Sequence, residues 1–312
     1  MSFATIKKIL PIIGIALFIF IIIKIDFVNI INEIKQADLL FIGLACILLF
    51  VMLIVQTYKW YVIALLQGIA IPFNKAFEIN MISNFYGFVT PSKAGGIIRA
   101  EYLREYADNK NIGQGLFNFT LDKIFDFCAV IFLTIVFSFV FKDKLALPIG
   151  LFIALFLGFI LVSLFFLHKE RSKFFLKFFY RRFIPKKYQD QAKITFENFY
   201  EHVPQKRYFI PLFFLNIISW CLVYLIIYCI GLSLGVELSF MYYLAILPLG
   251  TLVSILPISI SGLGTREAVL ISLFGLFGVA AVKTFTMSLI NIIIVGIIPS
   301  IIGIWLVMRR KD

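Results

Sequence analysis

The sequence has 312 residues, of which 62% are hydrophobic and only 15% are charged, and its mean hydropathy is +1.00. A water-soluble domain of this length would need far more polar surface, so the composition excludes that class. The net charge of +12 would suggest nucleic acid in a soluble protein, but Lys and Arg also accumulate in the cytoplasmic loops of membrane proteins. We therefore expect an integral membrane protein that has no nucleic-acid partner.

Apolar runs recur along the whole chain. A hydrocarbon core of ~30 Å takes ~20 residues of helix, and the runs are continuous rather than alternating, which excludes a transmembrane barrel. Because backbone groups in lipid must be satisfied within their own segment, the runs are predicted to be helices. We expect one all-α integral membrane domain over residues 1–312, with full spans at about 9–28, 39–58, 116–141, 145–167, 209–231 and 285–307.

Two further apolar segments are interrupted near their middle. The first covers about 76–106 and is broken at Thr90-Pro91-Ser92, and the second covers about 239–282 and is broken between Pro257 and Gly264. Each half is too short to cross a bilayer comfortably. These segments are therefore predicted to be broken helices.

The polar loop 168–208 carries 11 basic and four acidic residues, so we place it in the cytoplasm. Basic residues also begin and close the chain, which predicts cytoplasmic termini in a plasma (inner) membrane. Within the loop, Lys173, Lys177 and Arg181 recur every four residues. That spacing predicts an amphipathic helix lying in the membrane interface, and a solvated connector is the alternative.

Counting crossings from a cytoplasmic N-terminus gives the broken segments their orientation. If the first one crossed fully, the basic loop would end up outside, so a re-entrant hairpin is expected at 76–106. The second broken segment must then enter and leave from the outer side. Two related hairpins of opposite orientation indicate an inverted repeat of the kind found in transporters. The alternatives are eight full spans, or Pro and Gly recurring by chance at helix kinks.

The two breaks also carry a family resemblance. Thr90-Pro91 followed by Gly95 and Arg99 resembles the first signature of the flippase-like family, which is the transmembrane region of lysylphosphatidylglycerol synthases and its stand-alone relatives. The stretch Leu256–Glu267 resembles the second and more specific signature.

The resemblance covers nearly the whole chain. Asp122-Lys123 with Asp126 is similar to the family's acidic–basic pair followed by an aspartate, whereas Gly96 stands where the family often has Glu. The resemblance implies lipid translocation or the handling of lipid-linked substrates. We do not expect lipid aminoacylation, which needs a separate soluble catalytic domain, because the sequence ends at Asp312 soon after its last predicted span.

The first break is a candidate anion site. A half-helix that starts near Ser92 would point free N–H groups and its positive dipole end into the bilayer. Gly95 would allow a headgroup to approach closely, Lys93 would add a point charge, and Arg99 would add a bidentate phosphate donor. The alternative is that both cations extend to the cytoplasmic surface.

The second break offers a similar set. Gly262 and Gly264 precede Arg266 and Glu267, which open the next half-helix. An arginine in a dipping hairpin is costly unless it has a purpose, so we count it as a binding residue. Glu267 has the alternative of serving only as a cap that complements the helix dipole.

Two aspartates complete the candidate site. Asp122 and Asp126 lie one helical turn apart on one face of a predicted span, and ionisable groups within a membrane are functional candidates by default. Either could couple protons to transport, or neutralise the arginines when no substrate is bound. Asp122 could instead pair simply with Lys123 or Arg99.

These observations favour a lipid flippase or translocase that binds an anionic or phosphate-bearing lipid headgroup between the two hairpins. The alternatives are a membrane-embedded transferase, with Asp122, Asp126 and Glu267 as its candidate acids, and a non-catalytic partner of a lipid-modifying complex. The sequence favours a non-enzymatic role and leaves the enzymatic one open. We assign no catalytic residue, metal ligand or cofactor, and we expect membrane lipids as partners, with a lipid-modifying enzyme as a further candidate.

Overall fold

The computed structural model describes residues 18–25, 27–90, 93–107, 110–145, 148–175, 185–255 and 262–309. Within these ranges every regular element is helical, and residues 18–25 and 169–175 are helical as well. The other helices are, in chain order, α2 (Phe27–Gln36), α3 (Leu39–Leu66), α4 (Phe73–Phe88), η1 (Ala94–Ile97), α5 (Ile98–Leu103), η2 (Arg104–Tyr106), α6 (Ile112–Val140), α7 (Lys142–Leu145), α8 (Ile149–Phe166), α10 (Lys186–Phe199), η3 (Lys206–Tyr208), α11 (Phe209–Ser233), α12 (Phe240–Ile255), α13 (Thr265–Gly275), α14 (Ala281–Asn291), η4 (Ile292–Ile297) and α15 (Ile298–Arg309).

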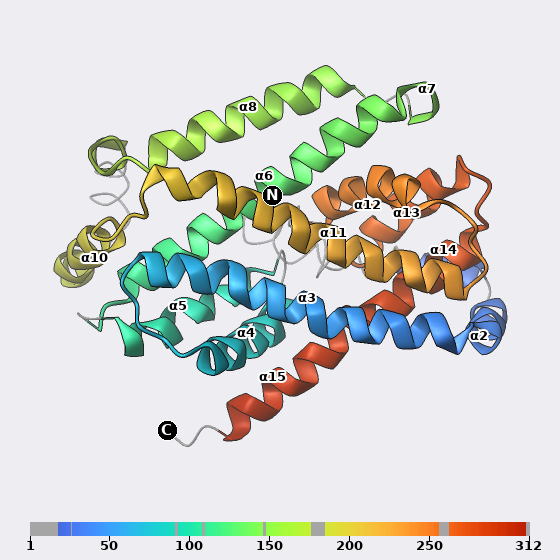
Figure 1. Cartoon of the computed structure of the whole chain (residues 1–312), viewed down its shortest axis with the longest axis horizontal. Helices are drawn as coiled ribbons and strands as arrows, with labels where there is room; N and C mark the ends of the chain where they lie inside the picture. The colour runs from blue at the N-terminus through green and yellow to red at the C-terminus, as the bar shows by residue number, and fades with distance from the viewer. Residues whose placement is uncertain are drawn as a thin grey trace.

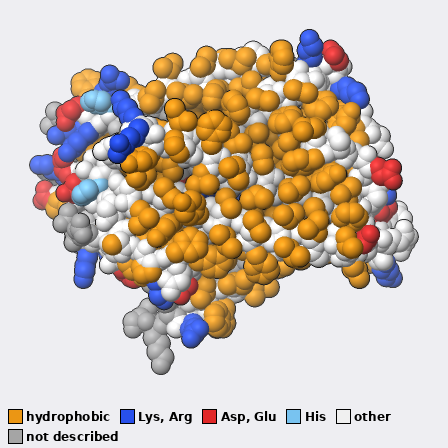
Figure 2. All heavy atoms as spheres, viewed as in Figure 1, with side chains coloured by type: hydrophobic (Ala, Val, Ile, Leu, Met, Phe, Trp, Pro, Cys, Tyr) orange, Lys and Arg blue, Asp and Glu red, His pale blue; other side chains and the backbone are white. Residues whose placement is uncertain are grey.

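Long apolar helices form the body of the molecule (Figure 1). Five helical segments of the described chain are long and apolar enough to cross a membrane, namely Leu39–Leu66, Ile112–Val140, Ile149–Phe166, Lys206–Ser233 and Ala281–Arg309. Figure 2 shows apolar side chains over the broad middle of one face, with charged side chains gathered at its two ends. This distribution suits a multi-pass membrane protein, whose middle lies in hydrocarbon.

Five of the six predicted spans coincide with these segments. The main difference is at the second one, predicted as 39–58, because α3 continues for eight further residues to Leu66. Half of the predicted span 9–28 lies outside the described residues, as does the segment 176–184 of the predicted interfacial helix. All-helical architecture is therefore confirmed, and the number of full crossings in the first 40 residues stays a prediction.

Side-chain caps set where two of the long helices begin. The Asp38 carboxylate accepts a hydrogen bond from the Leu40 N–H (2.8 Å) at the start of α3. The Asn111 side chain accepts one from the Gly113 N–H (2.8 Å) at the start of α6. Such caps satisfy backbone donors that have no partner within the helix, which fixes the entry point of each span.

The bundle has two ends, which we call the α10 end and the α7 end after the helices that lie there (Figure 1). Helices α3 and α11 run antiparallel, because the Asp38 N–H at the start of α3 donates to the Ser233 carbonyl at the end of α11 (2.9 Å). The C-terminal end of α3 therefore lies at the α10 end, and that of α11 lies at the α7 end. The chain continues from the end of α3 into the first broken segment, and from the end of α11 into the second.

The first broken segment folds back on itself. Helix α4 ends at Phe88, and η1 and α5 return along it, so that the Ser83 hydroxyl of α4 donates to the Gly96 carbonyl (2.9 Å). We call α4, η1 and α5 the first hairpin. It starts at the α10 end, where α3 finishes (Figure 1).

The second broken segment has the same form. Helix α13 packs on α12 closely enough that a Cβ atom added to Gly250 would lie 2.8 Å from the Leu270 Cδ2 atom. We call α12 and α13 the second hairpin. It starts at the α7 end, where α11 finishes, so the two hairpins extend from opposite ends of the bundle (Figure 1).

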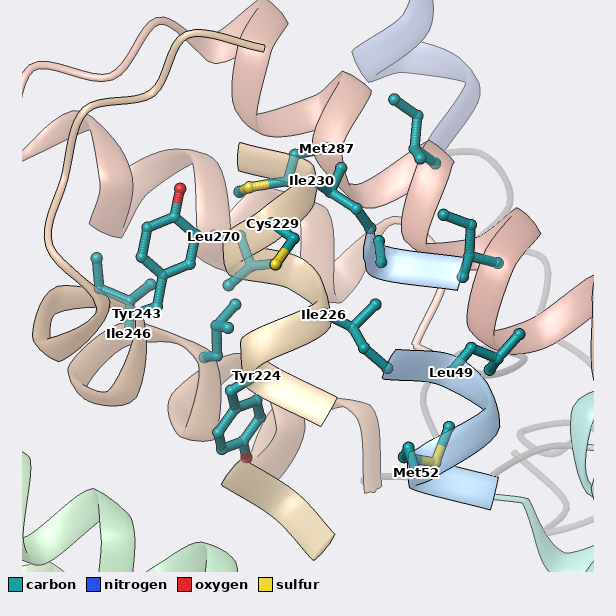
Figure 3. Close-up of a cluster of buried hydrophobic side chains, with 14 of the residues drawn as sticks. Leu49, Met52, Tyr224, Ile226, Cys229, Ile230, Tyr243, Ile246, Leu270 and Met287 are labelled. Atoms are coloured by element: carbon teal, nitrogen blue, oxygen red, sulfur yellow. The ribbon is translucent and has the colours of Figure 1, made fainter. Parts of the chain in front are cut away.

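The largest core cluster surrounds α11 (Figure 3). Its buried side chains include Tyr224, Ile226 and Ile230 of α11, with Leu49 of α3 and Tyr243 of α12. Lipid tails are as apolar as these side chains, so burial away from lipid adds little by itself. Close dispersion contacts between the helices have to supply the stability.

The last apolar segment is one continuous helix whose hydrogen-bonding pattern changes from α to π and back to α. Helix α14 passes through the π-helical turn η4 into α15. In α15, Gly303 lies directly against the Met81 carbonyl of α4, and a Cβ atom added there would also lie 2.8 Å from the Phe85 Cβ atom. Gly296 of η4 has similarly little room next to Phe88. Small residues thus allow this helix to approach the first hairpin.

We predict that Gly303→Ala lowers the thermal stability of the protein in detergent, because the added methyl group meets α4 backbone. Gly43→Ala is the matched control, because a Cβ atom there meets nothing within 4 Å. A helical Gly→Ala change in open space stabilises by about 0.5–1 kcal/mol. Equal melting temperatures for the two variants would contradict the packing of α15 on α4.

Candidate functional site

The turn of the first hairpin is held by Thr90. Its hydroxyl donates to the Tyr86 carbonyl (2.8 Å) and accepts from the Gly95 N–H (2.7 Å). A Cβ atom on Gly95 would lie 2.7 Å from the Tyr86 carbonyl carbon. The glycine therefore makes room for α4, whereas the sequence suggested that it makes room for a headgroup.

Lys93 lies at the tip of this hairpin, immediately before η1. Its φ angle is +55°, in the left-handed region that few residues other than glycine adopt. Its side chain is exposed, and it forms no ion pair with an acid of the described part of the chain. An uncompensated lysine on a strained backbone is typical of a functional position.

A buried cluster of charges lies beside this tip. Lys59 of α3 forms ion pairs with both aspartates of α6, at 3.0 Å to Asp122 Oδ1 and also to Asp126, and it donates to Asn216 Oδ1 of α11 (3.0 Å). Asp126 is also bound by Lys123 (2.7 Å). Lys59 is only 3% exposed and Asp122 only 1%. Each buried charge thus has the partner that burial requires.

Arg99 of α5 joins the same cluster. Its guanidinium donates to Asp122 Oδ2 (3.0 Å) and stacks on Trp60, with 4.8 Å between Arg99 Cζ and the ring centroid. The Trp60 indole N–H in turn donates to Asn80 of α4 (3.3 Å). The arginine is buried, so it does not extend to the surface, and the pairing with Asp122 considered from the sequence is present.

The tip of the second hairpin has its own network. The Glu267 carboxylate accepts from the Gly264 N–H (2.6 Å), from Arg266 Nη2 (2.7 Å) and from the Ser288 hydroxyl of α14 (2.7 Å). Gly264 and Gly262 have φ angles of +82° and +80°, which explains glycine at both positions. Glu267 therefore caps α13 and also holds Arg266, so the structural role and the charge pairing occur together.

The two hairpin tips carry charges that act on each other. Lys93 of the first hairpin lies within electrostatic range of Arg266 of the second, as well as of Lys123, Asp126 and Lys59. All the charged candidates named from the sequence thus belong to one region. The acids in it are each held by other cations, which leaves Lys93 facing an excess of positive charge.

Lys59 and Asn216 are the main members that the sequence analysis missed. The second span was predicted to end at residue 58. Lys59 therefore counted as a residue just outside the membrane rather than as one within the span. The signal was present, because an apolar run from Trp60 to Leu66 follows it, and a lysine inside a span is a functional candidate. Asn216 carries no comparable signal, since single polar residues are common in membrane helices.

We predict that Lys59→Met destabilises the protein by about 3–5 kcal/mol, because it leaves buried carboxylates without their shared cation. Adding Asp126→Asn should recover part of that loss. Lys75→Met is the control, because Lys75 pairs with Glu78 on the surface (3.0 Å) and should cost less than about 1 kcal/mol. Thermal unfolding in detergent measures all three, and equal effects of both single changes would contradict a buried cluster.

Comparison with known proteins agrees with the motifs. Residues 9–303 match the family model described as the lysylphosphatidylglycerol synthase TM region. A UPF0104 membrane protein of Methanothermobacter thermautotrophicus is 24% identical over 303 residues, covering 89% of this chain and 86% of the relative. The match spans both hairpins and every candidate residue. The chain therefore belongs to the family of lysylphosphatidylglycerol synthase transmembrane regions.

Proposed function

We propose that this protein binds a lipid with an anionic, phosphate-bearing headgroup where the two hairpin tips approach, and that it moves the headgroup across the membrane there. The observation that carries the proposal is that Lys93 of the first hairpin and Arg266 of the second lie within electrostatic range of each other. Two like charges within this range repel each other. An anion between them would remove that repulsion and bind both tips.

Neighbouring groups favour the same ligand. The Nε–H group of buried Arg99 has no hydrogen-bond partner among the described residues, so its guanidinium retains a donor. The stretches 91–92 and 256–261, which adjoin the tips in the sequence and lie outside the described residues, contain no acidic residue. A phosphate would therefore meet donors and positive charge from both sides, as phosphate sites in proteins require.

The arrangement of the hairpins supports movement as well as binding. They start at opposite ends of the bundle, as in transporters whose substrate site lies between two inverted halves. In this proposal each hairpin re-enters the membrane from its own side, and the α10 end with its basic loop faces the cytoplasm. The lipid tails would stay in the bilayer while the headgroup passes between the tips.

The transferase alternative receives less support from the side chains. A general acid or base needs a carboxylate that can exchange a proton near its substrate. Asp122, Asp126 and Glu267 are instead each held by one or more cations. That arrangement suits residues that fix positively charged groups in place.

The transport proposal is tested with purified protein in vesicles that contain fluorescent phosphatidylglycerol or a polyprenyl phosphate. We expect headgroups to appear in the opposite leaflet faster than in protein-free vesicles. Rates equal to those of protein-free vesicles for both lipids would overturn translocation.

We predict that Lys93→Gly weakens binding of phosphatidylglycerol by about 10- to 100-fold, because it removes a charge-assisted contact worth about 1.5–3 kcal/mol. Lys110→Gly is a closely matched control, since Lys110 is also exposed and also has a positive φ angle (+45°). Glycine suits both backbones, so both variants should fold. Titration followed by native mass spectrometry measures binding, and equal affinities in the two variants would contradict the site.

The orientation gives a separate prediction. Cysteines introduced by Asp190→Cys and Glu237→Cys, both at exposed positions, should react with a membrane-impermeant maleimide from the cytoplasm and from the outside, respectively. Residue 190 lies on α10, and residue 237 follows α11 at the other end of the bundle. Reversed labelling, with residue 190 reacting from the outside and residue 237 from the cytoplasm, would mean that the first hairpin crosses the membrane completely.

A further inference from the structure

A groove runs along α6 on the face away from the charge cluster. Its wider part has a volume of about 720 Å³ and lies between α6, α8 and α10, with Thr120, Phe166 and Phe196 in its lining. A second hollow of about 400 Å³ lies between α6, α8 and α11 and reaches Phe156. Ile124, Ser163 and Leu167 line both, so the two hollows adjoin each other along α6 and α8.

The groove exists because α8 is attached to the bundle on one side only. Its main contacts are with α6, and of its 18 residues only Ser163 is buried. Gly150 and Gly158 of α8 face open space, since a Cβ atom at either would meet nothing within 4 Å. Helix α8 is thus surrounded by lipid over most of its surface, and the groove beneath it opens toward that lipid.

The lining decides what fills the groove. A water molecule needs two to four polar partners, and this lining is almost entirely apolar. An empty hollow of this size would forfeit dispersion contacts that membrane helices depend on. The volumes lie within the range of about 300–1,000 Å³ that is typical of small-molecule sites. Hydrocarbon from the surrounding bilayer is the occupant that meets all three conditions.

One end of the groove lies under the basic loop. Helix α10 covers this end. The hydroxyl of Tyr200, directly after α10, donates to the Phe166 carbonyl at the end of α8 (2.6 Å), and Glu197 of α10 forms an ion pair with Lys169 of the helical stretch 169–175. The described residues of the loop 168–208, which leave out 176–184, include eight basic residues and four acidic ones. Positive charge at the mouth of an apolar groove selects a tail that is attached to an anionic headgroup.

We propose that this groove is a binding site for an acyl chain of an anionic phospholipid whose headgroup lies against the basic loop. On a helix with 3.6 residues per turn, Ile124 is about 200° from Asp122. The groove is therefore a second lipid site, separate from the one proposed between the hairpin tips. The two can be disproved independently, because this one requires no movement of headgroups.

The test uses full-length protein in nanodiscs with phosphatidylglycerol that carries a photoreactive diazirine in one acyl chain. Cross-linked peptides are mapped by mass spectrometry. In the unmodified protein we expect cross-links on the groove faces of α6, α8 and α10. Cross-links confined to the outward face of α8 around Gly158 would overturn the proposal.

Ser163→Phe should fill the groove and lower the yield of groove cross-links by about tenfold, which corresponds to about 1.4 kcal/mol. Gly158→Phe is the matched control, because it adds the same ring to the same helix on the open side. Thr195→Phe, on α10, fills the groove from outside the spans and covers the case in which Ser163→Phe does not fold. Equal yields in the folded groove variant and in the control would refute the site.

Discussion

The ion pairs of Lys59 with two aspartates of α6 are the interaction on which the interior of this protein depends. In lipid, apolar burial does not hold helices together, and an unpaired charge is costly. Once Lys59 is inside the bundle, α3 and α6 have to take the rotation and depth that bring it to Asp122 and Asp126. The charges thus specify an arrangement that apolar surfaces alone would leave open.

The same cluster also attaches the first hairpin to the spans. Asp122 accepts Arg99 of α5 with one oxygen while the other faces Lys59. The arginine is then held on its other side by the ring of Trp60. A short helix such as α5 could not maintain its place by hydrogen bonds of its own. The position of α5 is set by the Asp122 carboxylate of α6, which also pairs with Lys59 of α3.

In the second hairpin, the arginine is neutralised by a carboxylate of the same hairpin. Glu267 holds Arg266, its neighbour in the chain, and satisfies the start of its own helix. The two halves therefore share a pattern of helix, break and arginine, but their arginines are neutralised in different ways. The second break has no lysine that corresponds to Lys93. Positive charge without a paired acid is therefore concentrated at the tip of the first hairpin.

The sequence was sufficient for what depends on neighbours along the chain. Span positions follow from the length of apolar runs, the breaks follow from Pro and Gly, and Arg266 with Glu267 are adjacent residues. Contacts that depend on helix rotation could not be predicted, such as those of Lys59 and Asn216 with partners on other helices. The close packing of Gly95 is another such contact, because only the folded hairpin shows that α4 occupies the space beside it.

The π-helical turn η4 has a mechanical consequence. It divides one continuous helix into α14, whose Ser288 binds the Arg266–Glu267 pair, and α15, whose Gly303 packs on α4. One continuous helix therefore contacts both hairpins, the second hairpin before the π-helical turn and the first hairpin after it. Such turns are rare inside helices and often occur at functional sites. A regular helix would connect the hairpins rigidly, whereas here the two contacts are separated by a π-helical turn, the kind of irregularity at which helices bend.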